Sequence, residues 1–141
     1  MEEKRICTER GTLLTFREIF LLLQSMGAER VNGICMEQEE ITDEDTVRLI
    51  AEMVRKGFLI PDTDRFRIEE ETGRMMTCMA YPEDSFELCL GEQIFYCYGR
   101  EGKILVTSLC QTRGKTLELA YFEKKDFEKW REGMEDGDGE Y

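Results

Sequence analysis

The stretch of residues 41–68 constrains the fold of this chain most, because it contains a helix, a helix stop and a hairpin in succession. Thr42 is the expected N-cap of a helix over residues 43–56, and the three acidic residues that follow it complement the positive end of the helix dipole. Gly57 fits the left-handed position that ends a helix. Residues 58–68 then predict a β-hairpin around a Pro-Asp-Thr-Asp turn. The expected inward stripe of the helix consists of Val47, Leu49, Ile50, Ala51, Met53 and Val54.

Two further helices are predicted in the first half of the chain. Thr15 and Glu18 have the spacing of a capping box, so we expect a helix that begins at Phe16 and is ended by Gly27. Another helix is expected over residues 69–80, where the chain approaches a proline that disfavours helical backbone. The buried face of the first helix is expected to hold Phe16, Ile19, Phe20, Leu23 and Met26, widened by Leu21 and Leu22.

From residue 86 the hydrophobic period changes to two, which is typical of half-buried strands. Short strands at regular spacing predict an antiparallel meander of four strands: residues 86–90, 94–98, 103–110 and 117–121. A last helix over residues 124–134 is expected to cover one side of this sheet with the residues Phe127, Trp130 and Met134.

These elements predict the α+β fold class: N-terminal helices with a winged-helix-like β-hairpin, then a four-stranded antiparallel meander and a C-terminal helix. We expect a single domain over residues 1–135, made of a helix-rich half (12–80) and a half with the sheet and last helix (85–135). The acidic residues 136–141 are expected to form a disordered tail. The hydrophobic content of 41% is that of a globular protein.

The whole chain is acidic, with a net charge of −12 and a pI of about 4.6. Residues 1–80 carry 11 Lys/Arg against 17 Asp/Glu and residues 81–141 carry 8 against 14, so each part has a net charge of −6. This even distribution argues against nucleic acid and anionic membranes as partners, because both require clustered cations. It favours a protein partner that is basic or helical, and it leaves the oligomeric state open.

The first residues lack the apolar run of a signal peptide, and no apolar stretch approaches the roughly 20 residues of a membrane span. We therefore expect a cytoplasmic location. The sequence has six cysteines: Cys7, Cys35, Cys78, Cys89, Cys97 and Cys110. None of them forms a Cys-x-x-Cys pair, so we expect reduced and mostly buried thiols, with those in the strands belonging to the core.

The chain contains no histidine, and so it lacks the commonest general base and metal ligand. The acids at positions 43–45 are better explained as helix-start residues than as a catalytic pair. The acidic residues 136–140 lack the spacing and the distal glutamate of a calcium loop. We therefore predict no catalytic, cofactor-binding or metal-binding residues.

Seven residues are candidates for binding a protein partner: Met75, Met76, Met79, Tyr96, Tyr98, Phe127 and Trp130. The methionines form either an adaptable groove or part of the core, and their helical spacing favours the core. The tyrosines form either an exposed aromatic surface or the inner face of the sheet, and we favour the inner face. The two residues of the last helix either dock on the sheet or form a surface that a partner covers.

Residues 13–80 resemble a winged-helix domain, in which the end of a helix leads through a Gly-Leu-Ile-like sequence into the wing. The sequence Arg-Lys-Gly-Phe-Leu-Ile occupies that place here. Two features depart from the pattern: only one clear helix lies between the first helix and the hairpin, and the helix in the recognition position opens with three acids. The resemblance therefore implies a domain that does not read DNA.

Most of the chain also resembles EspG-like proteins of type VII secretion systems. The residues that carry this resemblance are Leu14 and Thr15, Gly33 and Ile34, residues 57–60 and residues 66–68, followed by the meander and the aromatic helix. Members of that family are cytosolic α/β proteins that bind secreted helical substrates, and the chain has about one structural half of their length. The resemblance implies a non-enzymatic binding protein.

The leading hypothesis is a non-enzymatic cytosolic module that binds a protein partner, such as a secretion chaperone, an adaptor or an immunity-type protein. A winged-helix-type regulator is one alternative. An enzyme that uses carboxylates and a divalent metal is the other.

Overall fold

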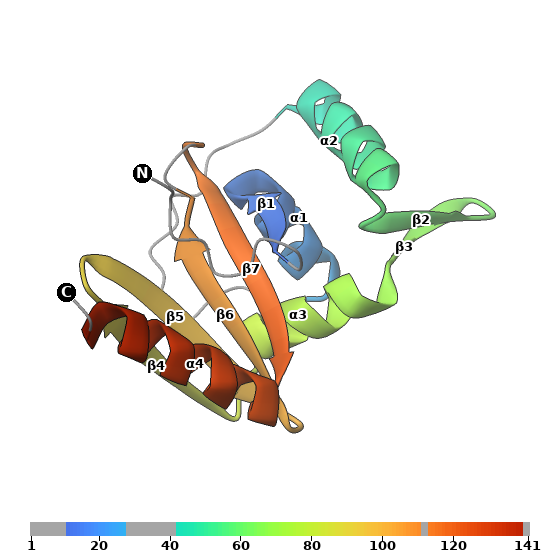
Figure 1. Cartoon of the computed structure of the whole chain (residues 1–141). Coiled ribbons are helices and arrows are strands. Elements are labelled where there is room, and N and C mark those ends of the chain that lie inside the picture. Colours follow the sequence, from blue (N-terminus) through green and yellow to red (C-terminus); the bar gives the residue numbers. More distant parts are fainter. Residues whose placement is uncertain (1–10, 28–41, 111–112, 140–141) are drawn as a thin grey trace.

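The computed structural model of the chain describes residues 11–27, 42–110 and 113–139, and it has the predicted α+β class. Its elements in chain order are β1 (Thr12–Thr15), α1 (Phe16–Ser25), α2 (Asp43–Lys56), β2 (Leu59–Asp62), β3 (Arg65–Ile68), α3 (Glu70–Ala80), β4 (Asp84–Leu90), β5 (Gln93–Arg100), β6 (Lys103–Leu109), β7 (Thr116–Glu123) and α4 (Lys124–Gly139). Figure 1 shows helices on both sides of a twisted sheet, with the β2–β3 hairpin reaching away from the body.

The main sheet is antiparallel, with the strand order β1-β7-β6-β5-β4. The meander from β4 to β7 is confirmed, but the sheet has five strands and not the four that we predicted. The fifth strand is β1, which pairs with β7 from Thr12 opposite Leu119 to Thr15 opposite Thr116. Sequence periodicity misses this strand because its four residues run directly into the first helix and show no alternation. Only the long-range pairing with β7 makes them a strand.

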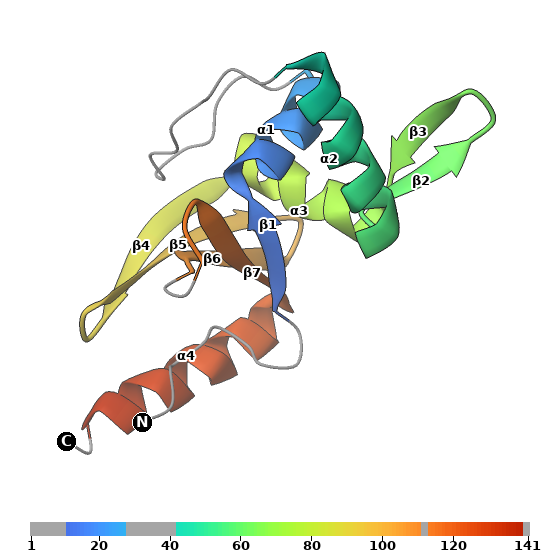
Figure 2. The same ribbon diagram turned by 90° about the horizontal axis from the view of Figure 1, so that it is seen from above.

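The two faces of the sheet carry separate cores. On one face, Tyr98, Leu105 and Leu119 pack with α1 and α3, while on the other Phe95 and Val106 pack with α4. Figures 1 and 2 show α4 alone on its side and the remaining helices on the opposite side. Because side chains two apart in a strand share a face, each strand of the meander contributes side chains to both faces of the sheet.

Helix α1 begins as predicted, and both halves of its capping box are formed. Glu18 N donates to Thr15 Oγ1 at 3.1 Å, and Thr15 N donates to Glu18 Oε1 at 2.9 Å. The buried stripe is shifted from the expected one: Phe16, Ile19, Leu22 and Leu23 are buried, whereas Phe20 and Met26 are half-buried. Because α1 packs between β1 and α3, its side chains on the far side reach solvent.

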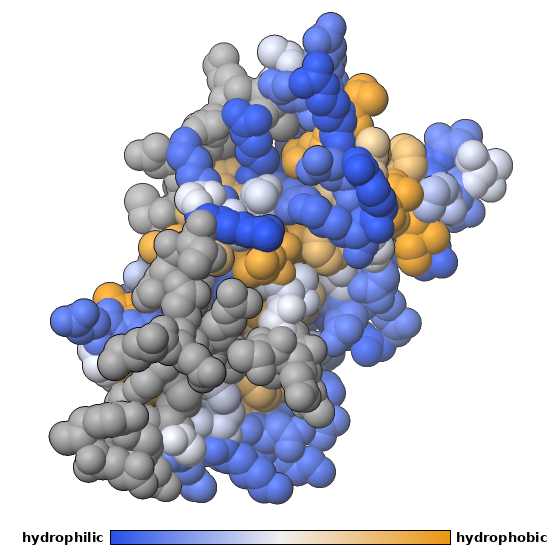
Figure 3. Space-filling view, turned by 45° about the horizontal axis from the view of Figure 1, so that its top comes forward, coloured by the Kyte–Doolittle hydropathy of each residue, from blue (hydrophilic) through white to orange (hydrophobic). Residues whose placement is uncertain are grey.

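Helix α2 has the predicted bounds, with Thr42 as its N-cap and Gly57 in the left-handed region at φ 88°. The expected inward stripe is confirmed in part: Met53 is buried and Leu49, Ile50 and Val54 are half-buried against the core, whereas Val47 is 67% exposed and Ala51 is also exposed. The helix lies at the margin of the molecule, so part of its apolar face packs on the core and the part that carries Val47 and Ala51 reaches solvent. In Figure 3, hydrophobic surface lies beside α2 and near the base of the hairpin, while most of the outer face of the helix is hydrophilic.

Helix α3 begins at Glu70, one residue after the predicted start, because Glu69 is its N-cap. The Glu69 carboxylate accepts hydrogen bonds from the backbone N–H groups of Glu71 and Thr72, and these bonds hold its pKa below the usual range. The hairpin before it turns at Thr63 and Asp64, within the predicted turn.

Helix α4 was expected to end at Met134 and to give way to a disordered tail from residue 136. It continues instead to Gly139. No proline interrupts these residues, so the backbone can remain helical beyond the last apolar position. The side chain of Met134 and residues 140–141 lie outside the described part of the chain.

Candidate functional site

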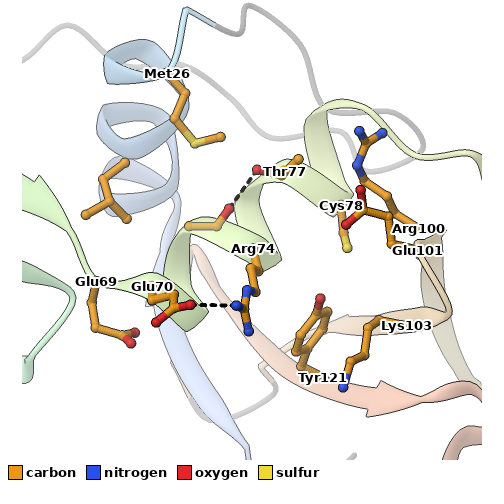
Figure 4. Close-up of a pocket in the computed structure, with 12 residues that line it drawn as sticks. Met26, Glu69, Glu70, Arg74, Thr77, Cys78, Arg100, Glu101, Lys103 and Tyr121 are labelled. Carbon is orange, nitrogen blue, oxygen red and sulfur yellow. Dashed lines mark hydrogen bonds and ion pairs between the residues drawn. The ribbon is translucent and has the colours of Figure 1, made fainter.

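A groove of about 580 Å³ lies between α3 and the ends of β6 and β7. Figure 4 shows that its walls come from distant parts of the chain. A second groove of about 400 Å³ continues from it and shares five residues with it, which are Glu69, Glu70, Arg74, Lys103 and Tyr121. Residues of the helix, of both strands and of the turn before β6 therefore meet at one surface.

Three cations of this acidic chain converge on the groove, and each already has a partner. Arg74 forms an ion pair with Glu70, one helical turn away. Lys103 Nζ lies 3.1 Å from Glu123 Oε1 and 5.8 Å from the centre of the Tyr121 ring. At the far end, the guanidinium of Arg100 donates to the carbonyl oxygen of Tyr81 at 2.7 Å. The groove thus has mixed charge and is not an unpaired cationic site.

Cys78 and Tyr121 line the same groove, and both remain protonated near neutral pH. Burial raises the pKa of the Cys78 thiol, and burial together with the neighbouring Cys78 raises the pKa of Tyr121 to about 12. A cysteine nucleophile must be a thiolate, so a raised pKa makes Cys78 a poor one. The groove is suited to hydrogen bonding and charge pairing with a ligand.

The residues predicted to bind a partner fall into two groups on opposite faces of the sheet. Met75, Met76 and Met79 are 4%, 0% and 0% exposed and belong to the core beneath α1 and α3. Tyr98 lies in the same core, and half-buried Tyr96 packs against it. None of the three methionine side chains is accessible to a partner in this structure.

Phe127 and Trp130 form the second group and pack on the sheet face beneath α4. Phe127 is buried, with its ring centre 5.9 Å from that of Phe86. Trp130 is half-buried and meets Phe95 edge-to-face at 5.3 Å between ring centres. The aromatic rings of both residues pack against the sheet, so α4 is docked on the sheet in this structure.

Sequence patterns did not single out an exposed apolar row on the face shared with α1 and α3. We call Cys89, Ile94 and Leu109 the sheet-face patch. Cys89 of β4 is paired with Ile94 of β5. The register between β5 and β6 pairs Tyr96 with Thr107, and the same register continued by two residues places Ile94 beside Leu109. Ile94 is 46% and Leu109 is 55% exposed. The alternation of these strands signals a shared face, but it does not signal that the helices leave this end uncovered.

Two of the described cysteines, Cys89 and Cys110, are less buried than predicted. Cys78, Cys89, Cys97 and Cys110 form no disulfide, whereas Cys7 and Cys35 lie outside the described residues. Cys97 is buried, and burial raises its pKa to about 12. Cys89 and Cys110 were expected in the core, but Cys89 is exposed and Cys110 is half-buried. Alternation within a strand does not show whether another element covers that face.

Within the described residues, no group of three or more carboxylate or thiol side chains is arranged to hold a metal ion. In the same part of the chain, no helix is long and apolar enough to cross a membrane. No protein-family model and no curated protein matches the sequence.

Proposed function

We propose that this chain is a non-enzymatic module that binds a protein partner through the sheet-face patch. The observation that carries the proposal is the exposure of Ile94 and Leu109 on adjacent strands of one sheet face. Single exposed apolar residues are normal on protein surfaces, whereas apolar residues that are contiguous and rimmed by polar groups mark interaction sites. The patch lies at the uncovered end of the face on which α1 and α3 pack.

The charge of the molecule supports a basic or amphipathic partner. A chain with a net charge of −12 attracts cationic surfaces over distances set by the ionic strength, which raises the rate of association and makes it sensitive to salt. The resemblance to EspG-like proteins agrees with this class of function, since members of that family bind secreted helical proteins. A cytoplasmic chaperone or adaptor is therefore the specific form of the proposal.

The proposal is tested by capturing the partner from lysates of the source cells with the immobilised protein and with two variants. Ile94→Asp places a charge in the patch, and Val47→Asp places the same charge on a more exposed apolar position of α2. A stoichiometric protein is expected with the parent and with Val47→Asp, and its recovery should fall at least about tenfold with Ile94→Asp. Both variants should keep the thermal midpoint of the parent.

Two results would contradict the proposal. One is equal recovery with Ile94→Asp and Val47→Asp, which would place the interface elsewhere. The other is the absence of any stoichiometric partner together with robust turnover of a small molecule in the presence of Mg²⁺ or Mn²⁺, which would favour the carboxylate enzyme.

A further inference from the structure

Strand β4 forms an open edge of the main sheet. It stands last in the strand order and pairs only with β5, and their register runs unbroken from Asp84 opposite Gly99 to Leu90 opposite Gln93. Among residues 11–27, 42–110 and 113–139, no loop or strand forms backbone hydrogen bonds to its outer side. The outer side therefore presents a row of backbone donors and acceptors, which is the template for adding another strand.

Features that commonly block strand addition are missing from β4. Its seven residues include no proline and no lysine, and its continuous register with β5 contains no bulge. The opposite edge of the sheet is different, since β1 has four residues and turns immediately into α1. The longer edge, which has an unbroken register, is therefore the one suited to a partner strand.

The charges around β4 select the kind of strand that fits. The β4–β5 hairpin and its approach carry Glu83, Asp84, Glu87 and Glu92, and no Lys or Arg occurs in residues 75–99. A second copy of the chain paired about a two-fold axis through Glu87 would bring this residue opposite its own equivalent, and like charges opposite one another destabilise strand pairs. A basic segment gains from the same charges.

The two faces of β4 specify the alternation of that segment. Ser85, Glu87 and Cys89 are exposed on the face of the sheet-face patch. Phe86 and Leu88 point to the other face, where Phe86 packs against Phe127 of α4. In a strand added beside β4, every second side chain would lie on the sheet face that carries Glu87. The remaining side chains would lie on the face that carries Phe86, Leu88 and α4.

We propose that β4 accepts an extended segment of the partner protein as a sixth strand, with Lys or Arg alternating with aliphatic residues. The inference rests on the proposed function and specifies the partner's segment. The sheet-face patch continues from the new strand across β4, β5 and β6, so residues that flank the segment in the partner would cover Ile94 and Leu109.

The test measures binding of the fluorescein-labelled peptide acetyl-Lys-Val-Lys-Val-Lys-Val-Lys-amide to the full chain by fluorescence anisotropy. A peptide of equal charge, with proline in place of the central valine, cannot pair as a continuous strand and serves as the control for charge alone. Glu87→Lys changes the charge on the edge, and Glu92→Lys makes the same change at an exposed position in the β4–β5 turn. Hydrogen exchange of residues 84–90 is followed with and without peptide.

We expect the valine peptide to bind more tightly than the proline peptide and to slow amide exchange in β4. Glu87→Lys should raise its Kd at least about tenfold, whereas Glu92→Lys should raise it less than about threefold. Equal binding of the two peptides, or equal losses in the two variants, would overturn the proposal because charge alone would explain the affinity. Protection, in the free monomer, of the β4 amides that point away from β5 would overturn it as well, since the outer side of the edge would then be paired.

A dimer seen by light scattering in which exchange of the outward-pointing β4 amides is slowed would assign the edge to a second copy of the chain and overturn the proposal of a basic partner. The failure of strand addition is distinguishable from failure of the proposed function. If neither peptide binds but Ile94→Asp still abolishes capture of the partner, the partner uses the sheet-face patch without adding a strand.

Discussion

At the scale of single residues, Gly57 shows how local chemistry decides where an element ends. Its φ of 88° lies in the left-handed region, and nothing lies within 4 Å of the position that a Cβ would occupy. Backbone conformation rather than crowding therefore demands glycine at this point.

Gly57→Val should lower the free energy of unfolding by more than about 1 kcal/mol, because a β-branched residue is strained at positive φ. Gly133→Ala is the control: it lies inside α4, its φ is not positive, and a Cβ there meets nothing within 4 Å. That change should be neutral or stabilising by up to about 1 kcal/mol. Urea denaturation measures both, and an unchanged midpoint for Gly57→Val would contradict the role assigned to this glycine.

Glu18 is a fully buried carboxylate with two roles. It completes the capping box of α1, and its Oε2 lies 3.0 Å from Lys56 Nζ at the end of α2. The lysine is 44% exposed, so solvent screens the pair and limits its contribution. The residue links two helices that are distant in sequence.

Glu18→Ala should cost about 2 kcal/mol, because it removes the hydrogen bond to Thr15 N and leaves a cavity beside the core. Glu18→Gln should cost about half as much, since an amide oxygen still accepts that bond. Lys56→Gln keeps the capping box intact and separates the ion pair from the cap. Equal destabilisation by Glu18→Ala and Glu18→Gln in chemical denaturation would show that charge, and not the cap, dominates.

At the scale of elements, α4 depends on a narrow docking surface. Its described apolar contacts to the sheet come from Phe127 and Trp130, and the Trp130 ring lies 5.7 Å from that of Phe122 and 5.9 Å from that of Phe127, centre to centre. The other described residues of the helix are polar or glycine, so without this aromatic cluster little would hold the helix on the sheet.

Trp130→Ala should destabilise the protein by about 2–4 kcal/mol, which is less than for a fully buried tryptophan because the side chain is half-buried. Trp130→Phe should cost less, since a smaller ring keeps part of the cluster. Trp130 is also the only tryptophan, so its emission should shift to the red on unfolding. Emission that is already red and readily quenched in the native monomer would contradict the docked helix.

At the scale of the whole molecule, β1 forms one edge of the sheet and shows that chain segments far apart in sequence form one core. Leu14 is fully buried on the α1–α3 side, opposite Leu117 of β7, whereas its neighbour Leu13 points to the other face and is half-buried. The two leucines are adjacent in sequence and differ only in the face that the pairing assigns to them.

Leu14→Ala should therefore lower the free energy of unfolding by about 2–5 kcal/mol, and Leu13→Ala by less than about 1 kcal/mol. Thermal or urea denaturation of the pair measures the contrast directly. Similar costs for both changes would mean that residues 12–15 are not held in register with β7.

Much of the local structure could be predicted because its signals lie within a few residues. Thr15 with Glu18, and Thr42 with Gly57, mark helix ends through hydrogen bonds and dihedral angles that involve near neighbours. The meander could be predicted for the same reason, since its period of two lies within each strand and its turns join consecutive strands. These features depend little on how the elements are packed.

What the sequence left undecided is which surfaces meet. Alternation shows that Leu117 and Leu119 share a face of the sheet. By the same rule, Cys89 and Glu87 share a face. No local pattern shows that α1 and α3 cover one end of that face and leave Ile94 exposed. The strand pairing of β1, the exposure of Val47 and the meeting of Arg74, Lys103 and Tyr121 at one groove likewise depend on contacts between distant segments. The physical reason is that burial is a property of two surfaces together, whereas periodicity describes one surface alone.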